Sequence, residues 1–127
     1  MESLIDVTAR AAVDEQTSAE RPWGAWHVLD VAPGYKVKRI EVHPGHRLSY
    51  QTHEHRAEHW IVVSGVATCV VEGTTITARP GDAVDVAQGA AHRIGNDGAE
   101  VLVIIEVQRG PYTGEDDIVR LEDDYHR

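Results

Sequence analysis

The chain has 127 residues and a formal net charge of −9, from 21 acidic and 12 basic residues. This length fits one domain, and the acidic balance argues against nucleic acid as a partner, because phosphate backbones are bound by basic surfaces. No apolar run approaches the roughly eighteen residues that a membrane span requires. The single cysteine, Cys69, lies in an apolar run, so we expect a buried, unreactive thiol and no disulfide.

Residues 1–20 are polar and alanine-rich with weak helical periodicity. We expect them to form an N-terminal extension that is loose or shortly helical. They lack the basic start and apolar run of a secretory signal, which together with the lone cysteine favours a cytoplasmic protein. The motif Arg-Pro-Trp-Gly at 21–24 marks the entry into one folded domain, predicted over residues 21–127.

Short strands separated by glycine and proline turns follow from there. They are rich in Val, Ile and Thr and are predicted at 26–31, 35–43, 48–53, 59–63, 67–72, 74–78, 83–86, 91–94 and 101–108. No helical segment long enough for a βαβ crossover lies between them. The pattern predicts an all-β sandwich or small barrel. Residues 116–125 contain Ile118, Val119 and Leu121, so we expect this segment to pack on the barrel.

Two acidic runs, at 115–117 and 122–124, crowd the C-terminus. Runs of like charge are usually solvated. We therefore expect both runs to lie on the surface.

The densest group of candidate ligands lies at residues 51–58. Alternate residues of a strand share a face, so Gln51, His53 and His55 are expected to point the same way. The next strand would present Glu58, and a third strand carries His92. Nitrogen and oxygen donors of this kind bind zinc, manganese, iron, cobalt or nickel. The pattern predicts one divalent metal ion, and parity alone does not decide between Gln51 and His55.

Two spaced motifs resemble those of the cupin superfamily. The first matches at Gly45, Gln51, His53, Glu58 and Gly65. The second matches at Gly81, Ala87, Gly89, His92 and Asn96. Gln51 and Ala87 replace a His and a Pro of the superfamily. The resemblance implies a double-stranded β-helix, or jelly-roll barrel, with its metal held by Gln51, His53, Glu58 and His92. Zinc is the first expectation for that metal, and His55 becomes a neighbour of the site.

Residues 21–127 further resemble the C-terminal cupin of type II phosphomannose isomerases, which are often fused to a mannose-1-phosphate guanylyltransferase. The segments that carry the resemblance are 21–24, 34–40, 51–65, 92–94, 105–108 and 114–118. The chain departs from the family at Glu54, at Ala87 and at Asp97. The resemblance implies a homodimer that interconverts mannose 6-phosphate and fructose 6-phosphate through a cis-enediol.

Residue roles follow from that implied reaction. A base must move a proton between C1 and C2, and we expect His55 to do so, with Glu106 as a weaker candidate. Lys38 shares strand parity with Ile40, so it would project into the barrel and meet the substrate phosphate. Arg56 is assigned with Lys38 and His55 to catalysis. The residues assigned to substrate binding are Arg47, Arg93 and Glu106.

Other interpretations remain open. Lys38 could pair with an acid of the chain, and Arg56 and Arg93 could make structural ion pairs. The protein could be a different metal-dependent cupin, such as a dioxygenase or a sugar epimerase. It could also be a non-catalytic module that binds a sugar or partners a separate nucleotidyltransferase.

Overall fold

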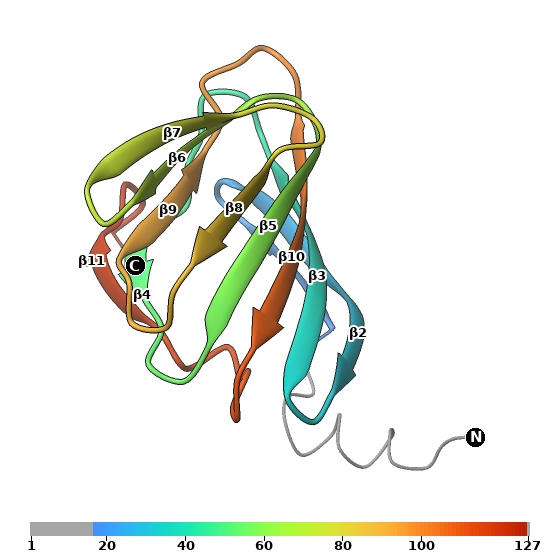
Figure 1. The fold of residues 1–127 in the computed structure, drawn as a ribbon. Helices are drawn as coiled ribbons and strands as arrows, with labels where there is room; N and C mark the ends of the chain where they lie inside the picture. The colour runs from blue at the N-terminus through green and yellow to red at the C-terminus, as the bar shows by residue number, and fades with distance from the viewer. Residues whose placement is uncertain (1–16, 127) are drawn as a thin grey trace.

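The structure is a computed structural model that describes residues 17–126. These residues form two antiparallel sheets that face each other as a barrel (Figure 1). The first sheet has six strands in the order β1-β2-β3-β10-β5-β8, and the second has five in the order β11-β4-β9-β6-β7. No helix occurs among the described residues, so none there could cross a membrane. The predicted all-β fold is confirmed.

The strand bounds are β1 Ser18–Arg21, β2 Gly24–Ala32, β3 Tyr35–Val42, β4 Tyr50–Thr52, β5 Ala57–Ser64, β6 Ala67–Val71, β7 Thr74–Ala78, β8 Ala83–Val86, β9 His92–Gly95, β10 Leu102–Arg109 and β11 Val119–Glu122. Each of the nine predicted strands corresponds to one of these. The other two, β1 and β11, lie at the ends of the two sheets.

Alternation of buried and more exposed residues along strands of the first sheet directs side chains into the barrel. Along β3, the residues at even positions from Lys36 to Val42 are buried, and along β5 Glu58, Trp60 and Val62 are buried. At one end these inward positions are apolar and form a core around Trp60 and Ile104. Toward the other end they are charged. The core also encloses Cys69, so the expected burial of the thiol is confirmed, and this burial raises the pKa of the thiol to about 12.

The N-terminal side of the domain differs from expectation. Residues 18–20, where the pattern favoured a loose or helical segment, lie in β1, which pairs antiparallel with β2 from Ser18 opposite His27 to Arg21 opposite Gly24. Residues 1–16 lie outside the described part of the chain. The boundary between extension and domain therefore stays a prediction.

The C-terminal segment crosses the second sheet and is held there by polar contacts. Strand β11 pairs with β4. Beyond it, Arg47 donates two hydrogen bonds to Asp124, at 2.7 and 3.0 Å, and the Tyr125 hydroxyl lies 2.6 Å from Nδ1 of His46. Between β10 and β11, residues 110–118 pass across one end of the barrel, at the bottom of Figure 1. We call these residues the end segment.

Gly24 opens β2 at a point where the backbone of β3 comes very close. Its φ is +152°, and a Cβ added there would lie 1.9 Å from the carbonyl oxygen of Glu41. Gly34 also has a positive φ, of +93°, but a Cβ at that position meets nothing within 4 Å. Gly24 therefore combines a positive φ with a steric clash, whereas Gly34 has a positive φ alone.

We expect Gly24→Ala to lower the free energy of unfolding by about 3 kcal/mol, because the new methyl group forces β2 away from β3. Gly34→Ala should cost about 1–2 kcal/mol, from the backbone conformation alone. Urea unfolding followed by tryptophan fluorescence measures both. Equal losses for the two variants would contradict the steric argument.

Candidate metal centre

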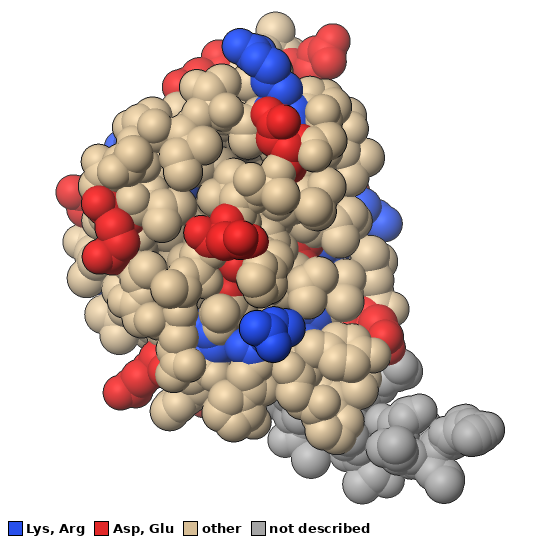
Figure 2. All heavy atoms as spheres, viewed as in Figure 1, with Lys and Arg blue, Asp and Glu red and all other residues tan. Residues whose placement is uncertain are grey.

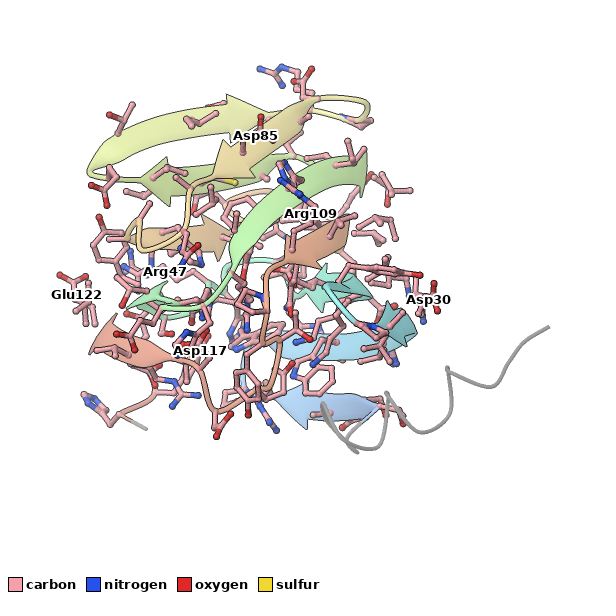
Figure 3. All side chains as sticks on the ribbon, turned by 60° about the horizontal axis from the view of Figure 1, so that its bottom comes forward. Asp30, Arg47, Asp85, Arg109, Asp117 and Glu122 are labelled. Carbon is pink, nitrogen blue, oxygen red and sulfur yellow. The ribbon has the colours of Figure 1, made fainter. Side chains whose placement is uncertain are left out.

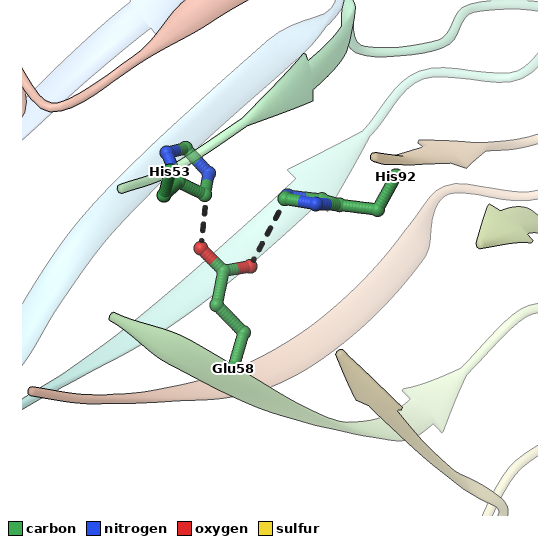
Figure 4. A group of neighbouring side chains, drawn as sticks. All are labelled: His53, Glu58 and His92. Atoms are coloured by element: carbon green, nitrogen blue, oxygen red, sulfur yellow. Dashed lines mark ion pairs between the residues drawn. The ribbon is translucent and has the colours of Figure 1, made fainter. Parts of the chain in front are cut away.

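Three side chains from separate parts of the chain converge inside the barrel. His53 directly follows β4, Glu58 is the second residue of β5, and His92 opens β9. Their ligand atoms all lie within 4.8 Å of one another, and all three residues are buried (Figure 4). Oε2 of Glu58 is 3.1 Å from Nε2 of His53, and Oε1 is 3.7 Å from Nε2 of His92. Both imidazoles thus face one carboxylate.

Strand register explains the convergence. Gln51 of β4 lies directly opposite His92 of β9, so His53, two residues on, comes beside His92, and the two rings lie 4.8 Å apart between centroids. Glu58 and Trp60 share the inward face of β5. Segments separated by nearly forty positions are therefore brought to one point by the pairing of strands.

Backbone carbonyls fix the orientation of both imidazoles. Nδ1 of His53 donates to the carbonyl oxygen of Asp117 at 2.6 Å, and Nδ1 of His92 donates to that of Ala90 at 2.9 Å. These bonds leave the Nε2 atoms of both rings facing Glu58, and a carbonyl bonded to Nδ1 is the arrangement of metal-binding histidines. Nε2 of His92 is buried without a hydrogen-bond partner among the described residues. Burial also lowers the pKa of His92, which favours the neutral, metal-binding form.

Glu58 is held as a carboxylate. Burial alone would raise its pKa, but the hydrogen bond with His53 and the charge of Arg56 outweigh burial and hold the pKa well below its usual value. The carboxylate accepts hydrogen bonds from Nε1 of Trp60 at 3.0 Å and from Nε of Arg56 at 3.0 Å. Two neutral imidazoles and one carboxylate fit a divalent ion of the predicted kinds.

Arg56 brings a positive charge to the same cluster. Its Nη2 lies 2.9 Å from Oε2 of Glu58 and 3.2 Å from Nε2 of His53. Its Nη1 donates to the carbonyl oxygen of Gly114 at 3.4 Å. The guanidinium therefore contacts two of the three candidate ligands, and a metal ion bound by both must share that space with it.

Gln51 lies beside the cluster, as the fourth predicted ligand. Its Nε2 is 3.1 Å from Nε2 of His53, and its Oε1 accepts a hydrogen bond from the Ser49 hydroxyl at 2.6 Å. Turning the amide by 180° would present Oε1 to the cluster, and the Ser49 hydroxyl could then accept from the amide nitrogen. Its membership of the ligand set stays a prediction.

A cavity of about 100 Å³ adjoins the cluster. Its lining includes His53 and Gln51 from the candidate centre. Six further charged residues also line it: Arg21, Lys38, Arg56, Glu106, Glu115 and Arg120. The cavity thus joins the candidate metal ligands to a set of charges inside the barrel. Trp26 closes one side, and Nζ of Lys38 lies 4.0 Å from the centroid of its ring.

Two buried lysines meet an acid of the end segment. Nζ of Lys38 is 2.6 Å and Nζ of Lys36 is 3.1 Å from Oε2 of Glu115. Burial would raise the pKa of Glu115, but the charges of Lys38 and Lys36 outweigh it and lower the pKa. The expectation that the whole acidic run 115–117 is solvated is therefore wrong at Glu115, because the lysines draw its carboxylate into the barrel. The alternative that Lys38 pairs with an acid of the chain is correct.

Glu106 lies on the inward face of β10 and lines the cavity. Its Oε1 accepts a hydrogen bond from Nε2 of Gln108 at 2.7 Å. Burial, with the neighbouring charge of Glu58, raises the pKa of Glu106 to about 8. Of the three residues predicted to bind substrate, Glu106 is the one that lines the cavity.

Three predicted site residues lie elsewhere. The side chain of His55 is 50% exposed and meets the ring of Tyr112. Arg47 pairs with Asp124 on the outside of the barrel, and Arg93 donates to the carbonyl oxygen of Leu48 and pairs with Glu122. None of the three lines the cavity. The contacts of Arg93 therefore match the alternative that it makes a structural ion pair, here with Glu122.

Sequence reasoning missed two acidic residues of the end segment that contact the site, Glu115 and Asp117. The Asp117 carboxylate accepts hydrogen bonds from the backbone nitrogens of Glu54 and His55, both at 2.9 Å, and its carbonyl holds His53. Figure 3 shows Asp117 just before β11. The acidic run was the visible signal, but nothing in its spacing distinguishes these residues from Asp116.

His92→Ala should weaken zinc binding more than about 100-fold, the upper range for losing a hydrogen-bond partner of a metal ligand. The matched control is His59→Ala, which removes an outward-facing imidazole paired with Asp85. Isothermal titration calorimetry and the metal content of the purified proteins measure the difference. A His92→Ala protein that retains its metal would remove His92 from the ligand set.

Asp117→Ala should weaken zinc binding by about 10-fold while leaving every candidate ligand in place, because the carbonyl that orients His53 loses its anchor. Asp116→Ala is the control, since the Asp116 carboxylate meets the hydroxyl of Tyr112 instead. Zinc titration of both proteins tests this role. An equal loss of affinity in both would assign the effect to the acidic charge of the run.

Comparison with known proteins finds one family and several relatives. The family described as mannose-6-phosphate isomerase C-terminal matches residues 8–123. The alginate biosynthesis protein AlgA of Pseudomonas aeruginosa is 44% identical over 123 residues, 97% of this chain and 26% of that protein. The mannose-1-phosphate guanylyltransferase of Salmonella montevideo is 45% identical over 107 residues, 84% of this chain and 23% of that protein. The chain thus spans about a quarter of the length of these relatives.

The predicted cupin fold is confirmed by comparison with solved structures. The cupin domain of Cnp3 from Schizosaccharomyces pombe aligns with a TM-score of 0.66 and 17% identity, over 68% of this chain and 64% of that one. The fold, the matched residues and the identity to AlgA agree with one another. The chain belongs to the family of mannose-6-phosphate isomerase C-terminal cupin domains.

Proposed function

We propose that this protein is a metal-dependent aldose–ketose isomerase that interconverts mannose 6-phosphate and fructose 6-phosphate. The observation that carries the proposal is the joint lining of one cavity by a candidate metal ligand, His53, and a buried ammonium group, Lys38. A sugar phosphate needs both, because its hydroxyl oxygens suit a metal ion and its phosphate suits a cation. Membership of the family supports the same substrate class.

The donor set supports a divalent ion held by His53, Glu58 and His92, with Gln51 as a fourth ligand. Zinc is proposed first, and manganese, cobalt, nickel or iron suit the same donors. When bound, such an ion supplies the positive charge that stabilises negative charge developing on the sugar oxygens.

The chain itself must move the protons. In the aldose-to-ketose direction a base removes the proton from C2 while O1 gains a proton, which gives the enediol. C1 then gains a proton as O2 loses one, which gives the ketose. We propose Glu106 as the group that carries the proton between C2 and C1, because its side chain lines the cavity. His55, the first choice from the sequence, has a half-exposed side chain.

Arg56 and Lys38 remain assigned to the substrate. Arg56 lies within hydrogen-bond distance of Glu58, so it is near enough to the metal ligands to stabilise an oxygen that gains negative charge. Lys38 lines the same cavity and is proposed to meet the phosphate. Arg47 and Arg93 hold the C-terminal segment by ion pairs, and we propose no contact of theirs with substrate.

A second function is favoured by one observation. The chain matches about a quarter of the length of relatives such as mannose-1-phosphate guanylyltransferase. A domain of this kind could therefore bind a sugar phosphate without converting it. Two histidines and one carboxylate also form the ligand set of many iron oxygenases, but buried lysines suit an anionic sugar better than a neutral oxygenase substrate. Saturable binding of mannose 6-phosphate without turnover would support the binding module.

Two further expectations stay predictions. A homodimer would cover apolar side chains on the outer face of β5, where Ile61 and Val63 are 42% and 52% exposed. Figure 2 shows this side of the molecule, on which uncharged atoms separate scattered acidic and basic groups. Sedimentation analysis tests the dimer. The cytoplasmic location rests on the sequence alone.

The 127-residue chain, loaded with zinc, manganese, cobalt or nickel, should form fructose 6-phosphate from mannose 6-phosphate in a coupled assay. Glu106→Gln should lower kcat by at least about 100-fold, the usual share of a proton-transferring group, with unchanged metal content. His55→Ala is the control and should retain most of the activity. A large loss in His55→Ala and a small one in Glu106→Gln would restore the assignment from sequence. Absence of turnover with all four metals would contradict the isomerase.

A further inference from the structure

Two lysine side chains lie inside the barrel, where an ammonium group is costly unless it meets an anion. Lys36 is 0% exposed and Lys38 is 4% exposed. Both come from the inward face of β3. Their nitrogens converge on one oxygen of Glu115, at 3.1 and 2.6 Å. The interior of the barrel therefore contains a built anion-binding position.

The anion now at that position belongs to the end segment, outside both sheets. The side chain of Glu115 is 25% exposed, so it reaches solvent as well as the lysines. It enters from residues 110–118, which pair with no strand. Glu115 could leave the lysines without breaking any strand pairing, whereas Lys36 and Lys38 are fixed in the middle of the first sheet.

Charge and volume both indicate a larger anion than a carboxylate. One carboxylate brings a single negative charge to two ammonium groups. A phosphate monoester carries a charge of about −1.5 to −2 near neutral pH. It would match the charges of both ammonium groups. The cavity beside Glu115 measures about 100 Å³, and small-molecule sites usually measure about 300–1,000 Å³. Removing the Glu115 side chain from the cavity enlarges it at the anion position.

We propose that Lys36 and Lys38 form a phosphate subsite in which the Glu115 carboxylate is an internal substitute, displaced when the phosphate of a ligand binds. The part of the end segment around Glu115 then moves with it and opens the cavity, while Asp117 keeps its contacts with His53 and with the backbone of Glu54 and His55. That the ligand is a sugar phosphate rests on the proposed function. The subsite itself depends on the lysines and Glu115 alone.

Calorimetric titration of the 127-residue chain with inorganic phosphate tests the subsite. Glu115→Gln should bind phosphate at least 10-fold more tightly than the wild type, because the competing charge is gone. Lys38→Met should lose phosphate binding. Glu54→Gln is the matched control, an exposed acid outside the cavity lining, and should leave the affinity unchanged. Equal affinity of wild type and Glu115→Gln, or undiminished binding by Lys38→Met, would overturn the proposal.

Displacement can be followed without any substitution, which covers the case that Glu115→Gln does not fold. Saturating phosphate should increase amide hydrogen exchange in peptides covering residues 110–116 of the wild type and leave exchange in β5 unchanged. Unchanged or slower exchange in the end segment would overturn the displacement.

A second arm with mannose 6-phosphate separates this proposal from the isomerase. Competition between mannose 6-phosphate and inorganic phosphate without turnover would retain the subsite and contradict the isomerase. Turnover of mannose 6-phosphate, together with a phosphate affinity that is the same in Glu115→Gln and the wild type, would support the isomerase and contradict the subsite.

Discussion

Glu58 places a negative charge in the interior where β4, β5 and β9 come together, and the candidate centre is built around the groups that hold it. Trp60 and Arg56 donate to the carboxylate, and the imidazoles of His53 and His92 face it. Removing one partner of a buried ion pair typically costs about 3–5 kcal/mol, because the other charge stays buried alone. The barrel therefore keeps Glu58 ionised only as long as these neighbours are in place, and an ionised Glu58 is what a metal ion requires.

Other buried charges along the interior of the barrel also need partners. Toward one end of the barrel, inward positions are apolar and pack around Trp60. Toward the other end they carry Lys36, Lys38 and Glu106, and each of these meets a polar partner or opposite charge. Those partners are not all supplied by the sheets, since Glu115 comes from the end segment. A segment without regular structure is thus needed to complete the electrostatics of a regular fold.

Much of this could be predicted from the sequence, because period-two alternation is a local property. It predicted nine strands, the inward face of β3 with Lys38, and the inward face of β5 with Glu58. Motif spacing then brought in His92. The prediction failed where a strand stops. Strand β4 covers just Tyr50–Thr52, so parity could not be carried back to Arg47, which faces outward, or forward to His55, which lies beyond the strand.

Long-range partners were invisible for a different reason. Nothing local distinguishes Glu115 from Asp116, because the distinction is made by two lysines almost eighty positions away. Strands β1 and β11 were also missed. Each lies at an end of its sheet. β11 is exposed along its whole length, and β1 alternates only between exposed and half-buried residues, so neither strand shows the apolar alternation of a strand that packs on the core. These two strands form because each finds an edge strand to pair with, β2 for β1 and β4 for β11.

The contact of Glu115 with the lysines has a consequence for discrimination between ligands. A neutral sugar that entered the cavity by pushing Glu115 aside would leave two ammonium groups in the interior without this carboxylate, which is an expensive exchange. A phosphorylated sugar brings a replacement charge. Specificity can therefore arise from a penalty on the wrong ligand as much as from attraction of the right one, and the resting contact would let the barrel reject abundant free hexoses with no dedicated steric barrier.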